Sequence, residues 1–322
     1  MKKKIDLIVE ELSTWEEGIE VNESVFYLES QNDVECPHRI VIDQESRGMG
    51  LKIVSVAPDN AKKSLPTVPA TILLVDPTTG IPQALVGGTF LTGFRTAAGT
   101  AVAVKYLERS KSDCKVLSIF GSGLQALCHI EAILHVRPSI KTVRIHSRTT
   151  ENVHTLIGQL RSKPYIPEDI EFVYEADVNT MVGDADIVVT ATSSSTPVFD
   201  GASLKDGSMV ISVGSAKPTA RELDSTVMNR ACLVVVDDIH SAGVSGDITS
   251  PIQEGSLKPE DIIKLCQVVK EKGIISTPPN RQSEKQTIIF YKSAGTAIQD
   301  ISTANMLYNK AIRLGKGLNV QT

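Results

Sequence analysis

A glycine-rich turn between a predicted strand and a predicted helix is the part of the sequence with the clearest chemistry. An apolar run at 116–120 leads into Gly121-Ser122-Gly123, and a helical pattern begins at Leu124, which gives the form G-x-G-x-x-A. The first glycine permits a sharp turn, and the second leaves room for a pyrophosphate beside the backbone. Free N–H groups at the helix start then bind the phosphate charge. The turn therefore predicts a dinucleotide-binding site.

The end of the next predicted strand bears on which dinucleotide binds. In NAD-binding proteins an acidic residue at this point binds the ribose 2′-hydroxyl. Here the strand ends in Ser147-Arg148-Thr149, and neither Asp nor Glu occurs at 145–149. A guanidinium can form paired charged hydrogen bonds with a 2′-phosphate. We therefore predict NADPH as the preferred cofactor, with NADH as the second candidate.

A second candidate site precedes the glycine turn. We expect a helix from Thr96 to Tyr106, which places Arg95 at its start, beside Thr96. An arginine and a threonine at a helix N-terminus can hold a carboxylate or a phosphate. A salt-bridged structural arginine is the competing interpretation, and these residues alone do not decide between the two.

The elements that would position these residues form two regions. From about Cys114 onward, strand-like and helix-like segments alternate, which is typical of an α/β fold with a doubly wound parallel sheet. Short runs rich in Val and Ile indicate strands covered on both faces. The expected strands are 116–120, 142–147, 170–175, 186–192, 209–214 and 232–238, and the expected helices are 124–136, 150–162, 177–183 and 221–230.

The remaining segments lack this alternation and carry no glycine fingerprint. The first 95 residues predict a smaller α+β domain, and the alternating region ends near Asp238. In the first region we expect a helix at 5–15 and extended stretches at 39–43, 51–56 and 67–75. After Asp238 we expect an amphipathic helix at 259–272, an extended segment at 287–292 and a last helix at about 296–314.

Composition argues against several classes of protein. The net charge of −5 gives no basic face for nucleic acid, and no segment approaches the ~18 apolar residues of a membrane helix. The five cysteines and six histidines are scattered without zinc-site spacing, so we expect no metal. Unpaired cysteines indicate reduced thiols and hence the cytoplasm.

Several segments taken together resemble one known family. R-T-A-A at 95–98, G-S-G-L-Q-A-L-C-H at 121–129 and V-G-S-A-K-P-T-A-R-E-L-D at 213–224 are similar to motifs of the ornithine cyclodeaminase/mu-crystallin family. The similarity continues in S-G-D-I at 245–248 and in F-Y-K-S-A-G-T-A-I-Q-D at 290–300. The chain is identified as a member of this family on these motifs.

The resemblance implies a homodimer of two-domain subunits. Its first domain binds the substrate and pairs with the partner subunit, and its second is a Rossmann domain. In this chain the first domain corresponds to residues 1–95, completed by 293–322, and the NAD(P)-binding domain to 96–292.

The resemblance also implies site residues. Arg39 and Arg95 look like the family's carboxylate-binding arginines, Lys52 looks like its active-site lysine, and Thr67 lies at the matching position. Two arginines can clamp an α-carboxylate, and a lysine near them can move a proton at the substrate nitrogen. We predict all four as substrate-binding, and Lys52 and Arg95 as catalytic. The predicted cofactor-binding residues are Thr96, Gly121, Ser122, Gly123, Leu124, Gln125, Ser147, Arg148, Thr149, Thr192, Val213 and Ser293.

A departure from the family bears on the reaction. Cyclodeaminases of the family carry an aspartate where this chain has Ala216, and an alanine cannot accept a proton. The segment is closer to the mu-crystallin type, whose members reduce cyclic ketimines with a nicotinamide cofactor. We therefore predict an NADPH-dependent reductase of small carboxylated imines. The alternatives are a redox-neutral cyclodeaminase with bound NAD and a catalytically weak NADP(H)-binding protein, which a short segment between Arg39 and Lys52 favours.

Overall fold

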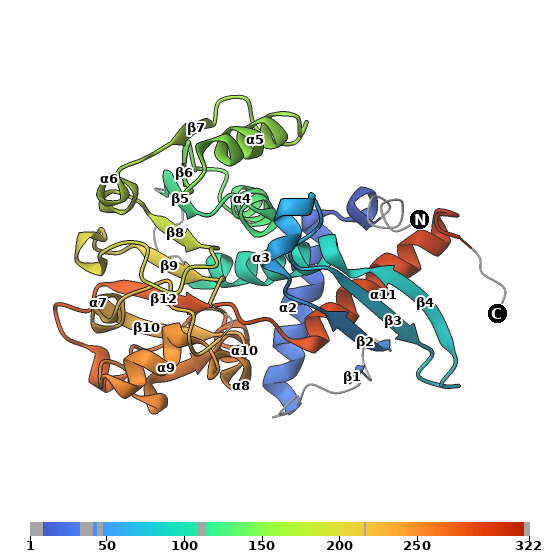
Figure 1. Cartoon of the computed structure of the whole chain (residues 1–322). Coiled ribbons are helices and arrows are strands. Elements are labelled where there is room, and N and C mark those ends of the chain that lie inside the picture. The colour runs from blue at the N-terminus through green and yellow to red at the C-terminus, as the bar shows by residue number, and fades with distance from the viewer. Residues whose placement is uncertain (1–8, 33–40, 44–47, 108–113, 216, 319–322) are drawn as a thin grey trace. The chain divides into compact units, whose positions relative to one another are not determined.

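The computed structural model of this chain describes residues 9–32, 41–43, 48–107, 114–215 and 217–318. The chain divides into two compact units, called here the first unit, residues 1–98 with 296–322, and the second unit, residues 99–295. Figure 1 labels their elements. Helix α3, Gly88–Leu107, begins in the first unit and ends in the second.

The first unit is an antiparallel sheet with helices packed against it. Its strand order is β1-β2-β3-β4. The strands are Val41–Asp43 (β1), Gly48–Val54 (β2), Ala70–Val75 (β3) and Pro82–Gly87 (β4). The helices are α2, Trp15–Asn32, and α11, Ala297–Arg313, and α11 contacts all four strands and α2. A short 3-10 helix, Pro58–Lys63, lies between β2 and β3.

Alternation along the strands decides which side chains face α11. Ile72 of β3 and Val86 of β4 lie in one apolar core with Ile301 of α11. Lys52 of β2 pairs directly with Ile72, and directly opposed residues of an antiparallel pair share a face. Lys52 is therefore on the face that α11 covers, whereas its neighbour Leu51 faces the other way.

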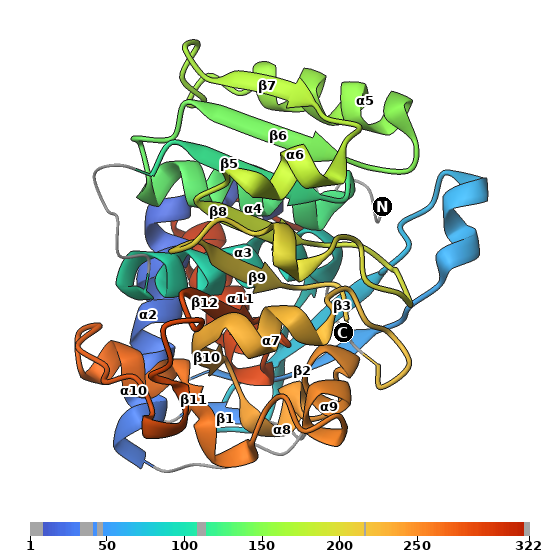
Figure 2. The ribbon, with the colours of Figure 1, turned by 90° about the vertical axis from the view of Figure 1, so that its left-hand side faces the viewer.

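The second unit is built on an eight-stranded sheet in the order β11-β10-β12-β9-β8-β5-β6-β7, and every pairing is parallel. Helices α4 and α5 lie on one side of it and α6 and α7 on the other (Figure 1), and Figure 2 shows the strands side by side. The chain runs outward from β5 to β7 and then returns to β8 beside β5, so the order of strands reverses there. This doubly wound Rossmann architecture confirms the predicted fold class.

The strands of this sheet are short and the helices between them are regular. The strands are Val116–Phe120 (β5), Thr142–His146 (β6), Glu171–Tyr174 (β7), Ile187–Thr190 (β8), Met209–Ser212 (β9), Ala231–Val236 (β10), Ile262–Lys264 (β11) and Ile288–Lys292 (β12). The helices are Leu124–Val136 (α4), Thr150–Arg161 (α5), Val178–Gly183 (α6), Ser225–Arg230 (α7), Ile239–Ala242 (α8), Gly246–Gln253 (α9) and Leu265–Lys270 (α10). Single 3-10 turns occupy Gly201–Ser203, Pro259–Asp261 and Pro279–Arg281. All residues of β8, β9, β10 and β12 are buried, as expected of strands covered on both faces.

Several elements differ from the sequence prediction. The expected α-helix at 259–272 is wrong over its first part, because a 3-10 turn and then β11 form there and only α10 is α-helical. The sheet does not end near Asp238, because β12 inserts between β10 and β9. Helix α2 was not predicted, since its weak helical pattern is stabilised by packing: Gly18 lies against the ring of Phe94, which also contacts Trp15 at a centroid distance of 4.7 Å.

Candidate functional site

The first unit contains a buried cluster of three charged side chains, Lys52, Arg95 and Asp300, called here the first cluster. Asp300 Oδ2 forms an ion pair with Lys52 Nζ, and Asp300 Oδ1 accepts a hydrogen bond from Arg95 Nε at 2.8 Å. The side chains of Lys52, Arg95 and Asp300 are only 12%, 7% and 4% exposed. One carboxylate thus holds two cations in a partly dry environment, and the cluster carries one more positive than negative charge.

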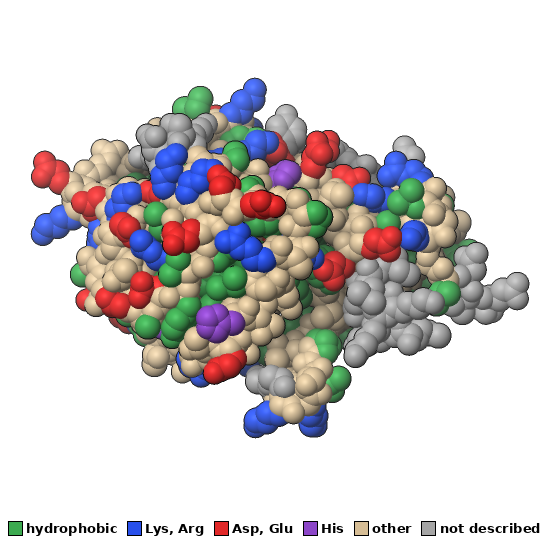
Figure 3. Space-filling model, turned by 90° about the horizontal axis from the view of Figure 1, so that it is seen from above, with side chains coloured by type: hydrophobic (Ala, Val, Ile, Leu, Met, Phe, Trp, Pro, Cys, Tyr) green, Lys and Arg blue, Asp and Glu red, His purple; other side chains and the backbone are tan. Residues whose placement is uncertain are grey.

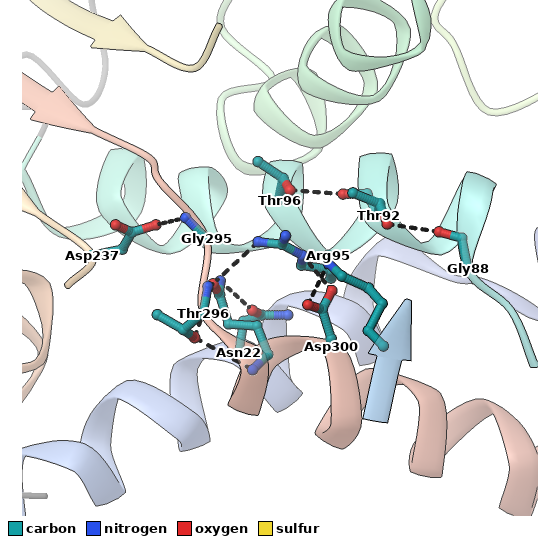
Figure 4. A network of polar contacts seen from close by, with 11 residues as sticks. Asn22, Gly88, Thr92, Arg95, Thr96, Asp237, Gly295, Thr296 and Asp300 are labelled. Carbon is teal, nitrogen blue, oxygen red and sulfur yellow. Dashed lines mark hydrogen bonds and ion pairs between the residues drawn. The ribbon is translucent and has the colours of Figure 1, made fainter. Parts of the chain in front are cut away.

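Helix α11 positions this cluster through its first turn. Thr296 caps the helix, and Gln299 completes a capping box by accepting from the Thr296 N–H at 2.9 Å. Gln299 Oε1 also faces Arg95 Nη1 at 3.4 Å, and Gln299 Nε2 donates to Asn22 Oδ1 of α2 at 2.8 Å. Figure 4 shows Arg95 of α3 pointing toward Asp300, with Asn22 and Thr296 close by. The network joins three helices around the Arg95 guanidinium.

The environment makes Lys52 a weaker base than an ordinary lysine. Burial and, to a lesser degree, the nearby Arg95 charge lower the pKa of Lys52 from 10.5 to about 8, while Asp300 acts in the opposite direction. Both forms of the amine are therefore accessible near neutral pH. A group of this acidity is suited to giving a proton to a basic nitrogen.

The structure corrects the local setting predicted for Arg95 and Thr96. Helix α3 begins at Gly88, so both residues lie inside the helix and not at its N-terminus. Thr96 Oγ1 donates to the Thr92 carbonyl at 2.7 Å (Figure 4). Arg95 must therefore bind an anion through its guanidinium alone, and its Nη2 makes no hydrogen bond within the described part of the chain.

The structure describes one of the two other predicted substrate residues, Thr67, which lies outside the first cluster. Arg39 lies outside the described residues. Thr67 is exposed in the connection between β2 and β3, where its carbonyl accepts from the Ala57 N–H at 2.8 Å. Their predicted roles stay predictions.

Sequence reasoning missed Asp300, Gln299 and Asn22. Asp300 and Gln299 end the family segment at 290–300, so a signal was present in the A-I-Q-D motif. Only the packing of α11 against β2 and α3 identifies Asp300 as the common partner of Lys52 and Arg95.

The glycine turn of the second unit has a geometry that fits a dinucleotide. Gly121 has φ +121°, and a Cβ there would lie 2.5 Å from the Ala191 carbonyl oxygen. A Cβ on Gly123 would meet nothing within 4 Å, so open space lies beside this residue. Gly123 is also the N-cap of α4 and provides no side-chain hydrogen bond, which leaves the first N–H groups of that helix for an anion.

Two further observations at the same turn agree with this fit. Gln125 Oε1, in the first turn of α4, is a buried oxygen with no hydrogen-bond partner among the described residues. Ser122 Oγ donates to Ser147 Oγ at 3.0 Å, which ties the glycine turn to the end of β6. The residues present are thus those that a pyrophosphate and a ribose would need.

The residues at the end of β6 leave a cation available. Arg148 is exposed and makes no hydrogen bond or ion pair with any residue that the structure describes. Thr149 is the N-cap of α5 and makes no side-chain capping bond. Both side chains can therefore reach a ligand without giving up an existing contact.

A second buried polar network lies at the carboxyl ends of β8, β9 and β12. Its charged members are Glu222, Asp247 and Lys292, called here the second cluster, and all three are completely buried. Glu222 Oε1 accepts from the N–H and Oγ1 of Thr192, at 2.6 and 2.7 Å. Lys292 Nζ donates to Ser212 Oγ at 3.1 Å, and Ser212 Oγ donates to Asp247 at 2.6 Å.

Three predicted cofactor residues lie beside this network. Thr192 follows β8, Val213 follows β9 and Ser293 follows β12. Val213 N–H donates to the Thr190 carbonyl at 2.8 Å, and Ser293 N–H donates to the Ser212 carbonyl at 2.9 Å. The carboxyl edge of a doubly wound sheet is where ligands bind in such folds.

Within the described ranges, no group of three or more His, Cys, Asp and Glu side chains is arranged to hold a metal ion. Among the described helices, none is long and apolar enough to cross a membrane. On the face seen in Figure 3, acidic and basic side chains are interspersed.

Comparison with known proteins establishes the family. A sequence model of the ornithine cyclodeaminase/mu-crystallin family matches residues 1–314. The chain therefore belongs to this family, as its motifs predicted.

Individual relatives cover most of the chain. A Dictyostelium discoideum protein named as an uncharacterized cyclodeaminase is 38% identical over 362 residues, with 97% of each chain covered. A Bacillus cereus Δ1-pyrroline-2-carboxylate reductase is 37% identical over 276 residues, which cover 85% of this chain and 80% of that protein. The structure of Thermococcus litoralis Δ1-pyrroline-2-carboxylate reductase in complex with NADH and L-proline matches with a TM-score of 0.85 and 33% identity, over 97% of this chain and 98% of that chain.

Proposed function

We propose that this protein is a reductase that uses a nicotinamide cofactor to reduce the C=N bond of a small carboxylated imine. The observation that carries the proposal is the first cluster, in which two largely buried cations, Lys52 and Arg95, share the single carboxylate of Asp300. A substrate carboxylate would balance the remaining positive charge. The Bacillus cereus and Thermococcus litoralis relatives, both named as reductases of a cyclic imino acid, support this substrate class.

Each residue of the first cluster has a distinct part in this reaction. Arg95 binds the substrate carboxylate through its free guanidinium nitrogen, which fixes the orientation of the C=N bond. Lys52 gives its proton to the imine nitrogen, and Asp300 holds both cations in place. A bound nicotinamide cofactor would supply the hydride for the imine carbon. The product is an amino acid, and Lys52 regains its proton from water.

We propose NADPH as the preferred cofactor. The preference rests on Arg148, whose guanidinium is exposed and unengaged among the described residues at the end of β6. A 2′-phosphate is the cofactor group that such a guanidinium would recognise. Gly121, Gly123 and the start of α4 would hold the pyrophosphate of either nucleotide.

Two alternatives make different predictions. The name of the Dictyostelium discoideum relative favours a cyclodeaminase, although Ala216 replaces the aspartate of that reaction. That alignment is longer than this chain, so the relative has residues that this chain lacks. A shortened first region would fit a weakly active NADP(H)-binding protein.

One assay panel separates the three functions. The full chain is incubated with NADPH or NADH and either 1-pyrroline-2-carboxylate or 1-piperideine-2-carboxylate, and nucleotide absorbance is followed. Imine-dependent oxidation of the cofactor is the expected result. Ammonia release from ornithine without net oxidation would identify a cyclodeaminase. Tight NADPH binding without turnover of any imine would identify a binding protein.

We also propose a homodimer that forms in the cytoplasm. The sheet face away from α11 carries a row of leucines, because Leu51 pairs with Leu73 and Leu73 pairs with Leu85. Leu51 and Leu85 are 46% and 67% exposed, an apolar surface that a second copy of the chain would cover. Leu85→Glu should convert a dimer to a monomer in light scattering; an unchanged mass would exclude this face. The four described cysteines are buried and form no disulfide, as reduced thiols would.

A further inference from the structure

We propose that Glu222 is a positioning residue for the nicotinamide cofactor, because its carboxylate fixes the two loops that follow β8 and β9. The proposal rests on the proposed function and extends it to a residue of the 213–224 motif for which the sequence analysis predicted no role. Glu222 lies between β9 and α7 and is completely buried. Its role is to act through Thr192 and Gly214, which face the carboxyl edge of the sheet.

The carboxylate of Glu222 accepts four hydrogen bonds from these two segments. Oε1 accepts from the N–H and the Oγ1 of Thr192, at 2.6 and 2.7 Å. Oε2 accepts from the Gly214 N–H at 2.7 Å and from Thr190 Oγ1 at 3.0 Å. Three of these bonds come from the two loops and the fourth comes from Thr190 at the end of β8, so the carboxylate bridges the two loops.

The two loops approach each other so closely that their backbones leave no room for a side chain. A Cβ on Gly214 would lie 1.9 Å from the Thr192 carbonyl oxygen and 2.7 Å from its nitrogen. Backbone N–H groups brought together in this way need an acceptor when they are buried. Glu222 is that acceptor for both Thr192 and Gly214.

Glu222 is itself held in place by hydrogen bonding to Asp247. Its own N–H donates to Asp247 Oδ1 at 2.8 Å, and Asp247 Oδ2 accepts from Ser212 Oγ, to which Lys292 also donates. Burial raises the pKa of Glu222, while the positive charge of Lys292 acts to lower it. The lysine at the end of β12 thus favours the ionised carboxylate that accepts the four bonds.

The location gives this bridge its function. The glycine turn between β5 and α4 lies where the strand order reverses, and the end of β8 is its direct neighbour: the Gly121 position abuts the Ala191 carbonyl. A dinucleotide bound at that turn extends along the carboxyl edge, past the ends of neighbouring strands. Loops already fixed before the cofactor arrives lose less conformational freedom when it binds. Glu222 therefore preorganises the part of the edge that Thr192 and Val213 form.

The test compares Glu222→Gln with the matched variant Thr190→Val in the full chain. Glutamine keeps the size of the side chain but offers one acceptor oxygen, so one loop loses its partner. Valine at 190 removes only a strand hydroxyl and leaves every bond between Glu222 and the loops. We expect the NADPH dissociation constant, measured by fluorescence titration, to rise about 10-fold or more in Glu222→Gln and less than about 3-fold in Thr190→Val.

A split in the kinetic constants separates positioning from general destabilisation. The cofactor KM should rise in Glu222→Gln while the imine KM stays within about 3-fold of the parent, since the first cluster belongs to the other unit. Equal cofactor affinity in Glu222→Gln and the parent would overturn the proposal and leave the proposed function intact. If the parent itself binds no nicotinamide nucleotide, both fall.

Hydrogen exchange on the unmodified chain tests the same point without any variant. The amides of Thr192 and Gly214 should be protected in the absence of cofactor, because Glu222 already holds them. Fast exchange at both amides, with protection only after NADPH is added, would mean that the cofactor orders the loops, and the proposal would be wrong.

Discussion

The first and second clusters each bring acidic and basic side chains together away from solvent, and they differ in how their charges are matched. In the first cluster, Lys52 and Arg95 share one carboxylate through contacts between side chains. In the second, the carboxylates of Glu222 and Asp247 outnumber Lys292, and each accepts hydrogen bonds from two backbone N–H groups.

This difference distinguishes a binding site from a structural support. The carboxylate oxygens of the second cluster accept hydrogen bonds from the chain itself. They therefore fix the backbone and offer few acceptor positions to a ligand. The first cluster keeps an excess cation and a free nitrogen on Arg95, which an anionic substrate can use. The comparison agrees with the proposed substrate recognition by the first unit and the proposed cofactor support by the second.

The most severe test of this assignment is to block the glycine turn of the second unit. Gly123→Val should abolish NADPH binding, a loss of at least about 100-fold, because the branched side chain fills the space needed by the pyrophosphate. The fold should survive, since nothing lies within 4 Å of a Cβ there. Fluorescence titration and a thermal melt measure the two effects.

A neighbouring glycine provides the matched control. Gly121→Ala places a Cβ 2.5 Å from the Ala191 carbonyl at a positive φ, so this variant should lose thermal stability. If Gly123→Val binds NADPH like the parent, the turn is only structural. A reversal of the two stability effects would also contradict this geometry.

The first unit is tested next, through its guanidinium. Arg95→Leu should raise the imine KM on the order of 100-fold, because the substrate carboxylate loses its charged hydrogen bonding to Arg95 and the C=N bond is misplaced. NADPH affinity should change far less. Arg95→Lys is the control that keeps the charge and should recover part of the loss. An unchanged imine KM in folded Arg95→Leu would remove substrate recognition from this cluster.

A smaller effect on cofactor binding is expected at Arg148. Here the comparison is between NADPH and NADH binding to the second unit. Arg148→Ala should weaken NADPH binding by roughly 1.5–3 kcal/mol, about 10- to 150-fold, and leave NADH binding nearly unchanged. Paired titrations with both nucleotides measure this. Equal affinity of the parent for NADPH and NADH would show that Arg148 reads no phosphate.

Local patterns predicted the second unit better than the first for a physical reason. The strand, the glycines and the helix at 116–136 are adjacent in sequence, so spacing alone reveals the turn and its chemistry. The pairing of Arg95 with Asp300 joins residues 205 positions apart, and depends on how α11 packs. No periodicity in either segment contains that information.

The position of β12 shows the same limit within the second unit. The sequence predicted an extended segment at 287–292. The position of this strand between β10 and β9 depends on which strands pair with it and not on the order of strands along the chain. The segment at 259–272 was assigned one helix because its apolar pattern is compatible with a helix, while pairing with β10 turns 262–264 into a strand. Tertiary contacts outweighed local preference in both cases.

The last prediction concerns the proton on Lys52 in the first cluster. The pH dependence of the reaction reports on the ionisation of this side chain. If protonated Lys52 supplies the proton, kcat/KM for the imine should be flat below the lysine pKa of about 8 and fall above it. Asp300 raises that pKa and Arg95 lowers it, and these are the two charged side chains that face Lys52 among the described residues. Asp300→Asn should therefore move the alkaline fall to lower pH, by about one unit.

A second variant separates this effect from the ionisation of the substrate. Lys52→Arg carries a guanidinium that stays protonated throughout the accessible range, so its alkaline fall should disappear if the variant retains activity. The imine ionises identically with all three proteins, and only the displacement between their profiles reports on the cluster. Coincident profiles for the parent and Asp300→Asn would show that Asp300 does not control the proton on Lys52. The positive excess of the first cluster would then serve carboxylate binding alone, and the proton would have to reach the nitrogen from water.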